Sequence, residues 1–147
     1  MPKILLFSDS HSHIESKLHP YLLSADEIWH AGDIGSMQVV EWMEEYKKPI
    51  RGVYGNIDDR TIRNMFPKIA RFSCEQVTVA MTHIAGAPSS YKPDALETFS
   101  MGIPMIFVCG HSHILLVQFY AGLNCLHLNP GAAGRTGWHK VQTLLKF

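Results

Sequence analysis

Seven side chains that can bind metal ions follow short apolar runs in this chain. The runs are KILLFS, EIWHAG, IRGVYG, VTVAMT and MIFVCG, and each is typical of a short buried strand. Ligands of open α/β sheets collect outside the carboxyl ends of such strands. Because buried Asp and His each need a partner or a metal ion, the pattern predicts one polynuclear metal site. Its expected ligands are Asp9, His11, Asp33, Asn56, His83, His111 and His113.

The types of these side chains favour hard divalent cations. Asp33 offers two carboxylate oxygens that can bridge two ions, and the preceding Gly32 permits close approach of the backbone. Asn56 offers a neutral amide oxygen, which suits manganese, magnesium or iron and is uncommon on zinc alone. His111 and His113 add two imidazoles on a glycine turn. Together these ligands are far more specific than any one of them.

Composition narrows the possible class of protein. At 147 residues the chain is expected to form a single domain over 1–147. Its 13 basic and 13 acidic residues balance, and the sequence has no basic stripe with interleaved aromatics. We therefore expect no nucleic-acid footprint. The apolar start is too short for a signal peptide and no run approaches a membrane span, so a cytoplasmic protein is expected. The three cysteines are too scattered for a disulfide framework or a thiolate zinc site, and we expect them in the core: Cys74, Cys109 and Cys125.

The elements that must position the ligands follow an α/β order in the first half. Helical spacing of apolar residues predicts helices over 14–24 and 36–47, the second with Ser36 as its N-cap and with Pro49 beyond its end. With the strands before Asp9, Asp33 and Asn56, this gives β-α-β-α-β, the order of a parallel sheet flanked by helices.

The second half is mostly β-structure, which predicts a second sheet packed on the first. A tight turn at Glu75 separates the first two strands, and a loop over 85–93 precedes a short helix over 94–101. The apolar run 114–120 could also serve a homo-oligomer interface. The strands are expected over 69–74, 76–82, 105–109, 114–120, 123–128 and 141–147.

The motifs resemble those of the calcineurin-like metallophosphoesterase superfamily. That family has D-x-H, G-D, G-N-x-D or G-N-H-E, a lone His and G-H-x-H in this order. Here they stand as Asp9-Ser10-His11, Gly32-Asp33, Gly55-Asn56-Ile57-Asp58, His83 and Gly110-His111-Ser112-His113. The resemblance spans 3–133, and the short length is similar to the compact bacterial and archaeal phosphodiesterase branch. It implies a β-sandwich of mixed sheets flanked by helices.

The resemblance also implies a ligand set and a reaction. One ion would be held by Asp9, His11 and His113, and the other by Asn56, His83 and His111, with Asp33 bridging them. Two divalent ions would hydrolyse small phosphodiesters through a bridging hydroxide. Manganese is the ion expected in assays, and iron, nickel, magnesium and zinc are left open. The residues expected to take part in catalysis are Asp9, Asp33, Asn56 and His83.

One position departs from the family pattern. Many members have a His after the ligand Asn, implicated as a proton donor to the leaving group, whereas this chain has Ile57. Either another residue or solvent donates the proton, or the natural leaving group needs no strong acid. His13 is the nearest spare imidazole in the sequence and is our candidate substitute. Two alternatives to a phosphodiesterase stay open: a phosphomonoesterase, and a protein-interaction module that keeps the fold without catalysis.

Other polar residues are expected to have structural roles. His30 would orient a loop or lie in the core, and Asp58 would accept hydrogen bonds from backbone amides. His19, His127 and His139 have no expected function. Two segments are left open: the turn that begins at Asn129 could lie near the site, and the 85–93 loop could line a substrate groove through Tyr91 and Lys92.

Overall fold

A four-stranded sheet built mainly from the first half of the chain carries three parallel strands. The computed structural model describes residues 1–13 and 15–147. The strand order is β11-β1-β2-β3, with β1 to β3 parallel and β11 antiparallel to β1. Apolar residues with the expected β-α-β-α-β order therefore form the sheet that the sequence predicts. Its strands are β1 (Ile4–Phe7), β2 (Glu27–His30), β3 (Ile50–Gly52) and β11 (Leu145–Lys146).

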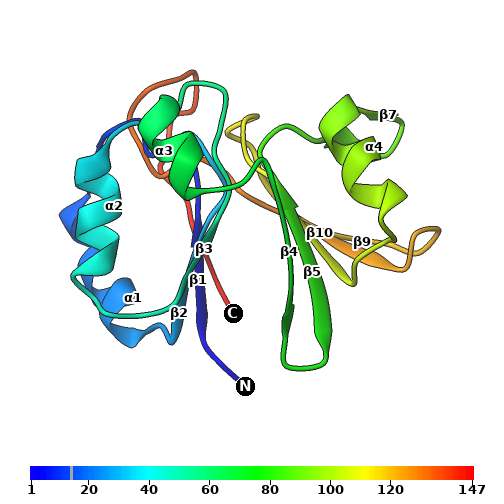
Figure 1. Cartoon of the computed structure of the whole chain (residues 1–147), viewed down its shortest axis with the longest axis horizontal. Helices are drawn as coiled ribbons and strands as arrows, with labels where there is room; N and C mark the ends of the chain where they lie inside the picture. The colour runs from blue at the N-terminus through cyan, green and yellow to red at the C-terminus, as the bar shows by residue number, and fades with distance from the viewer. Residues whose placement is uncertain (14) are drawn as a thin grey trace.

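A second sheet of five strands stands opposite the first (Figure 1). Its order is β4-β5-β8-β10-β9, in which β8 is parallel to both of its neighbours and the outer pairs are antiparallel. The fold is therefore a sandwich of mixed sheets, as expected. The strands are β4 (Ile69–Cys74), β5 (Val77–Thr82), β8 (Ile106–Val108), β9 (Leu115–Tyr120) and β10 (Cys125–Pro130).

Alternation along the strands divides the core into layers. In β1, Leu6 faces the second sheet and packs with Trp29, Met81 and Val108, whereas Leu5 faces the helices. Each fully buried side chain of this size stabilises the fold by roughly 1.5–3 kcal/mol relative to an exposed one. A one-residue slip of β1 would exchange these two sets, so the packing also fixes which side chains leave the strand toward the site.

Helices cover the outer faces of both sheets (Figure 1). Helices from the first half bury Leu22, Val40 and Ile62 against the first sheet. On the second sheet, α4 packs Ala95 against a layer that includes Phe107. The helices are η1 (Ser16–Leu18, a 3-10 helix), α1 (His19–Ser24), α2 (Met37–Glu44), α3 (Arg60–Met65) and α4 (Pro93–Ser100).

Several boundaries differ from the prediction. The 14–24 helix starts only at η1, with Ile14 outside the described residues, and Ser36 precedes α2 without a side-chain cap bond. The 141–147 strand shortens to β11, because the backbone N–H of Thr143 donates to Ala132 O and its hydroxyl donates to Pro130 O in the preceding segment. Helix α3 was not predicted, and the 85–93 loop contains a small hairpin of β6 (Gly86–Ala87) and β7 (Ser90–Tyr91).

The three cysteines are free, as expected, but they are not equally buried. Cys109 and Cys125 are buried beneath the α4 layer, whereas Cys74 is only partly buried at the end of β4. Among the described residues, no helix has both the length and the apolar character that a membrane crossing needs.

The last strand of the second sheet extends past the sandwich core. In β10, Leu126 and Leu128 face the space between the sheets, and their partners on β9 are Phe119 and Val117. Cross-strand partners share a face, so these two side chains continue the core-facing surface. Yet Val117 is 59% and Phe119 57% exposed. An uncovered apolar strip therefore runs along the sheet edge.

Candidate metal centre

The predicted ligands leave the strands through strongly bent backbone. Asp9 follows β1 and Asp33 follows β2, and both have φ of 54°; both side chains are buried. Five of the seven predicted ligands have positive φ, the other three being His11, His111 and His113. Non-glycine residues in this region cost of order 1–3 kcal/mol each and gather at functional sites, where the surrounding contacts hold them.

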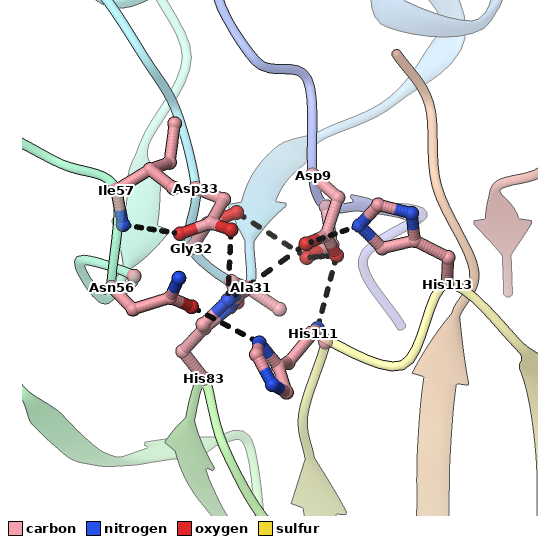
Figure 2. Close-up of polar contacts among 12 residues, drawn as sticks. Asp9, Ala31, Gly32, Asp33, Asn56, Ile57, His83, His111 and His113 are labelled. Atoms are coloured by element: carbon pink, nitrogen blue, oxygen red, sulfur yellow. Dashed lines mark hydrogen bonds and ion pairs between the residues drawn. The ribbon is translucent and has the colours of Figure 1, made fainter. Parts of the chain in front are cut away.

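The structure brings six of the seven predicted ligands into two adjoining groups. Asp9, His11 and His113 form one group, and Asp33, His83 and His111 form the other; within each group the potential ligand atoms lie within 4.8 Å of one another. Asp33 joins the groups, since its Oδ2 lies 3.4 Å from His11 Nε2 and 3.3 Å from His83 Nε2. Figure 2 shows this carboxylate next to His83 and facing Asp9.

Two buried imidazole nitrogens at this junction have no hydrogen-bond partner among the described residues. His83 Nδ1 donates to the carbonyl oxygen of Ala31 at 2.7 Å, which leaves Nε2 to face Asp33. The Nε2 atoms of His83 and His11 are buried and lack hydrogen-bond partners among the described residues. A nitrogen and a carboxylate oxygen this close need a proton or a metal ion between them. A carbonyl that accepts from the far nitrogen is the usual support of a metal-binding His. The residues therefore fit divalent cations.

The charges at the junction favour a bound cation. Burial alone would raise the pKa of Asp33, but the neighbouring His83 imidazole, the backbone N–H of Ile57 and the charge of His11 lower it overall. Burial opposes charge on His83, yet Asp33 and Asp9 raise its pKa overall. The carboxylate thus stays ionised and attracts a proton to the histidine, and a metal ion can replace that proton.

Glycines make room for the carboxylates. A Cβ on Gly110 would lie 2.2 Å from Ser8 Oγ and 2.9 Å from Asp9 Oδ2. A Cβ on Gly55 would lie 2.0 Å from Asp33 Oδ1. The glycines before His111 and Asn56 are therefore required by the close approach of the backbone to the two acids.

Asn56, the seventh predicted ligand, reaches the second group through His111. Its Oδ1 lies 3.0 Å from His111 Nδ1 (Figure 2). Arg63 supports the turn, since its Nε donates to Asp58 O at 2.6 Å and its Nη2 to Asn56 O at 3.1 Å. The guanidinium also stacks on Tyr54, 4.8 Å from the ring centroid. A cavity of about 230 Å³ beside Asn56 is lined by Tyr54, Arg63, Lys68 and His83, among others.

Asp58 has the role expected for it. Its Oδ2 accepts from the backbone N–H of Gly55 at 2.7 Å and of Ile34 at 3.2 Å, and its Oδ1 accepts from Gly35 at 2.7 Å. The carboxylate therefore links the loop that carries Asp33 to the turn that carries Asn56.

His30 is buried and supports the same loops without facing either ligand group. The backbone N–H of Gly32 donates to His30 Nδ1 at 3.1 Å, so Nε2 carries the proton and donates to Ser10 Oγ at 2.9 Å. Burial lowers the pKa of His30 to about 3, which keeps the ring neutral. His13 instead contacts Glu15, with 2.6 Å between His13 Nε2 and Glu15 Oε1. Its proposed acid role would require it to leave that carboxylate.

Two segments left open by the sequence are now placed. Asn129 Nδ2 donates to Gly110 O at 2.9 Å and to Ser112 Oγ at 3.0 Å, so the turn that begins there supports the His111–His113 turn. Tyr91 packs on Phe99, with 4.9 Å between ring centroids, and belongs to the α4 layer.

Sequence reasoning missed His139. Its Nδ1 lies 3.1 Å from His113 Nδ1, although its position in the sequence indicates no function. The only available signal was local: Gly134 and Gly137 precede this His in a segment that forms no strand.

Comparisons with known proteins give the family. The model for the calcineurin-like phosphoesterase superfamily domain matches residues 2–146. A search of curated proteins found no match. Three solved structures are similar. The solution structure of a Thermotoga maritima protein is 28% identical, with a TM-score of 0.71 and coverage of 90% of this chain and 85% of that one. An archaeal phosphodiesterase is 19% identical, with a TM-score of 0.65 and coverage of 89% and 84%. Vps29 of Entamoeba histolytica complexed with Zn²⁺ is 15% identical, with a TM-score of 0.73 and coverage of 96% and 80%. The family match over nearly the whole chain, on a fold that carries the motif residues at one end of its strands, means that this protein belongs to the calcineurin-like phosphoesterase superfamily.

Proposed function

We propose that this protein is a cytoplasmic, single-domain, dinuclear metal-dependent phosphodiesterase that acts on small phosphodiesters. The observation that carries the proposal is the position of Asp33 Oδ2, 3.4 Å from His11 Nε2 and 3.3 Å from His83 Nε2. One carboxylate oxygen next to two imidazole nitrogens, each belonging to a different ligand group, is the arrangement that a bridging ligand requires.

The ligand set gives a charge suited to a diester. Two divalent ions contribute +4, and Asp9 and Asp33 reduce this to +2, since the imidazoles and the Asn56 amide are neutral as ligands. Such ions would supply a hydroxide at neutral pH and would neutralise the charge of the phosphorane-like transition state. A hydroxide and a phosphodiester monoanion would balance the remaining +2. A phosphomonoester dianion would bring one more negative charge.

The cavity beside Asn56 would hold one substituent of the substrate phosphate. The 230 Å³ cavity adjoins Asn56 and His83 and is large enough for a small substituent of the phosphate. Lys68 in this cavity is paired with Asp94 and Glu97, each at 3.0 Å. Since Arg63 is bonded to backbone carbonyls, both cations already have partners, and the cavity favours a neutral substituent over a second phosphate.

Ile57 lies where many relatives have a histidine. Its side chain is 45% exposed and cannot donate a proton, and its backbone N–H donates to Asp33 Oδ1 at 3.1 Å. The backbone of Ile57 therefore links the two ligand loops, and solvent is left to protonate the leaving group. We infer a preference for substrates whose leaving group departs without a strong acid.

A comparison of two aryl substrates tests the proposal. With Mn²⁺ the protein should hydrolyse bis(p-nitrophenyl) phosphate faster than p-nitrophenyl phosphate, and Asp33→Asn should lose most of this activity. His19→Ala is a suitable control, because His19 is exposed and contacts Tyr46 far from the centre. A strong preference for the monoester would favour the phosphomonoesterase instead.

The archaeal phosphodiesterase of similar fold supports the proposal that this protein is an enzyme, and the zinc complex of Vps29 supports a metal-binding role for this fold. A protein-interaction module is the outcome if the purified chain binds no metal ion and hydrolyses neither ester. Other ions that the ligand set accepts are iron, nickel, magnesium and zinc, and activity with each can be compared in the same assay.

A further inference from the structure

His139 contacts the candidate ligand His113 through a hydrogen bond whose direction can be assigned. His139 Nε2 lies 2.8 Å from the carbonyl oxygen of Gly134, and its Nδ1 lies 3.1 Å from His113 Nδ1. A carbonyl oxygen only accepts, so the proton of the neutral His139 ring is on Nε2. Its Nδ1 is then an acceptor, and His113 Nδ1–H is the donor.

This direction leaves the other nitrogen of His113 available to a metal ion. A neutral imidazole carries one ring proton, and here His139 holds that proton on Nδ1. His113 Nε2 therefore presents a lone pair toward the first ligand group, 3.1 Å from Asp9 Oδ1. The ring planes of His113 and His139 are nearly perpendicular, at 76°, which fixes the orientation of His113 as well as its tautomer.

The same contacts tie His113 to a second ligand, Asp9. The backbone N–H of Gly134 donates to Asp9 O at 3.1 Å, while Gly134 O accepts from His139. Asp9, Gly134, His139 and His113 thus form a circuit linked by three hydrogen bonds, and a cation between His113 Nε2 and the Asp9 carboxylate would close it. These hydrogen bonds constrain two of the three ligands of the first group, Asp9 and His113, at once.

Two glycines make this circuit possible. A Cβ on Gly137, where φ is 130°, would lie 2.3 Å from His113 Nδ1 and 3.1 Å from His139 Nδ1. A Cβ on Gly134 would lie 2.4 Å from Ser10 O and 2.6 Å from Asp9 O. Each glycine stands at a point where a side chain would separate the members of the circuit.

We propose that His139 is a positioning residue for the metal ion held by Asp9, His11 and His113. It sets the tautomer and orientation of His113 and does not touch the ion. This role rests on the proposed function, because it has meaning only if the first ligand group binds a cation. Loss of a supporting partner of this kind typically weakens metal binding by 10- to 100-fold.

Calorimetric titration of the metal-free full chain with Mn²⁺ tests the role without measuring activity. We expect two binding events in the wild-type protein. In His139→Ala, one event should weaken by about 10- to 100-fold while the other is unchanged. His139→Asn should restore most of the lost affinity, because the Asn Oδ1 can occupy the place of Nδ1 and accept from His113. His19→Ala should bind as the wild type does.

A second measurement follows the tautomer directly. In the Zn²⁺-loaded protein, ¹⁵N chemical shifts should show the His113 proton on Nδ1 in the wild type, and Gly137→Ala should broaden or shift this signal while circular dichroism stays native. Equal Mn²⁺ affinity in His139→Ala and the wild type would overturn the positioning role alone. Weakening of both events without rescue by Asn would do the same. Absence of any Mn²⁺ binding by the wild type would overturn the proposed function as well.

Discussion

His83 and Asp33 face each other with a ring nitrogen and a carboxylate oxygen 3.3 Å apart, while the second nitrogen of His83 donates to a backbone carbonyl. This contact is favourable only with a cation between the two atoms. The free energy of unfolding should therefore rise when a metal ion takes that place.

Mn²⁺ should stabilise the wild-type chain more than His83→Ala. For a single site, ligand at 100 times its Kd stabilises the folded state by about 2.7 kcal/mol, which raises the Tm by several degrees. His83→Ala removes a ligand of the second group and should lose at least half of the Mn²⁺-dependent rise in Tm. Thermal unfolding with Mn²⁺ and with EDTA measures the difference, and His19→Ala is the control. An equal rise in wild type and His83→Ala contradicts His83 as a ligand.

Asp58→Asn should lower stability and activity together. The carboxylate accepts from three backbone N–H groups, those of Gly55, Gly35 and Ile34. Asn presents one oxygen and places an NH₂ group against at least one donor, at a cost of about 1.5–3 kcal/mol. Urea unfolding gives the loss, with Asp26→Asn as the control, because Asp26 is exposed and accepts a single bond from Lys3 N. A stable Asp58→Asn protein with normal Mn²⁺ affinity would show that the link between the two loops is not needed.

Most of the fold could be predicted because its strands are buried and apolar. The runs before Asp9 and Asp33 are hydrophobic on both faces, one against the helices and one against the second sheet, so their strand character is evident without alternation. Helix α3 was missed because only Ile62 is buried among its six residues, although Asp59 caps it by accepting from Ile62 N–H at 3.0 Å. One buried residue gives no helical periodicity.

The candidate ligands were identifiable because strand ends and glycines mark them, whereas their supporting residues have no such marks. Asp58 could be interpreted from its place in a turn. His139 could not, because its contact with His113 depends on the path of a loop that returns from β10 across 26 positions. Long-range hydrogen bonds of this kind follow from packing, which local sequence patterns do not encode.

Acid should destabilise the protein partly through His127, which lies in the α4 layer. Burial lowers its pKa to about 4 from an ordinary value of 6.5. Above pH 6.5 both folded and unfolded chains carry a neutral ring, so the full stability is present. Between pH 6.5 and pH 4 the unfolded chain binds a proton that the folded chain does not, so the free energy of unfolding decreases as the pH is lowered. Below about 4 this loss is complete.

His127→Phe should remove this component. Phe lacks the titrating nitrogen and can pack against Phe107, whose ring centroid lies 5.0 Å from that of His127. Between pH 7 and pH 5 the wild type should lose about 1–2 kcal/mol more stability than the variant. Urea unfolding at the two pH values measures the difference. Parallel losses in both proteins would show that His127 does not titrate in this range.

The exposed strip on β9 should mediate self-association. We expect a second copy of the chain there, because β9 is an edge strand that contains neither a proline nor a charged residue to prevent pairing. Its sequence, LLVQFY, is also apolar on the core-facing side. Antiparallel pairing of two β9 strands would place the Val117 and Phe119 side chains of both copies on one continuous face.

Val117→Lys with Phe119→Lys should therefore convert a dimer into a monomer. Light scattering coupled to size-exclusion chromatography gives the mass of each protein, and hydrolysis of the diester should be unchanged, because the strip lies outside the ligand groups. Leu23→Lys is the matched control, since Leu23 is 60% exposed on α1. A monomeric wild type over the whole accessible concentration range contradicts pairing through β9, and a dimer that survives both lysines assigns the interface to another surface.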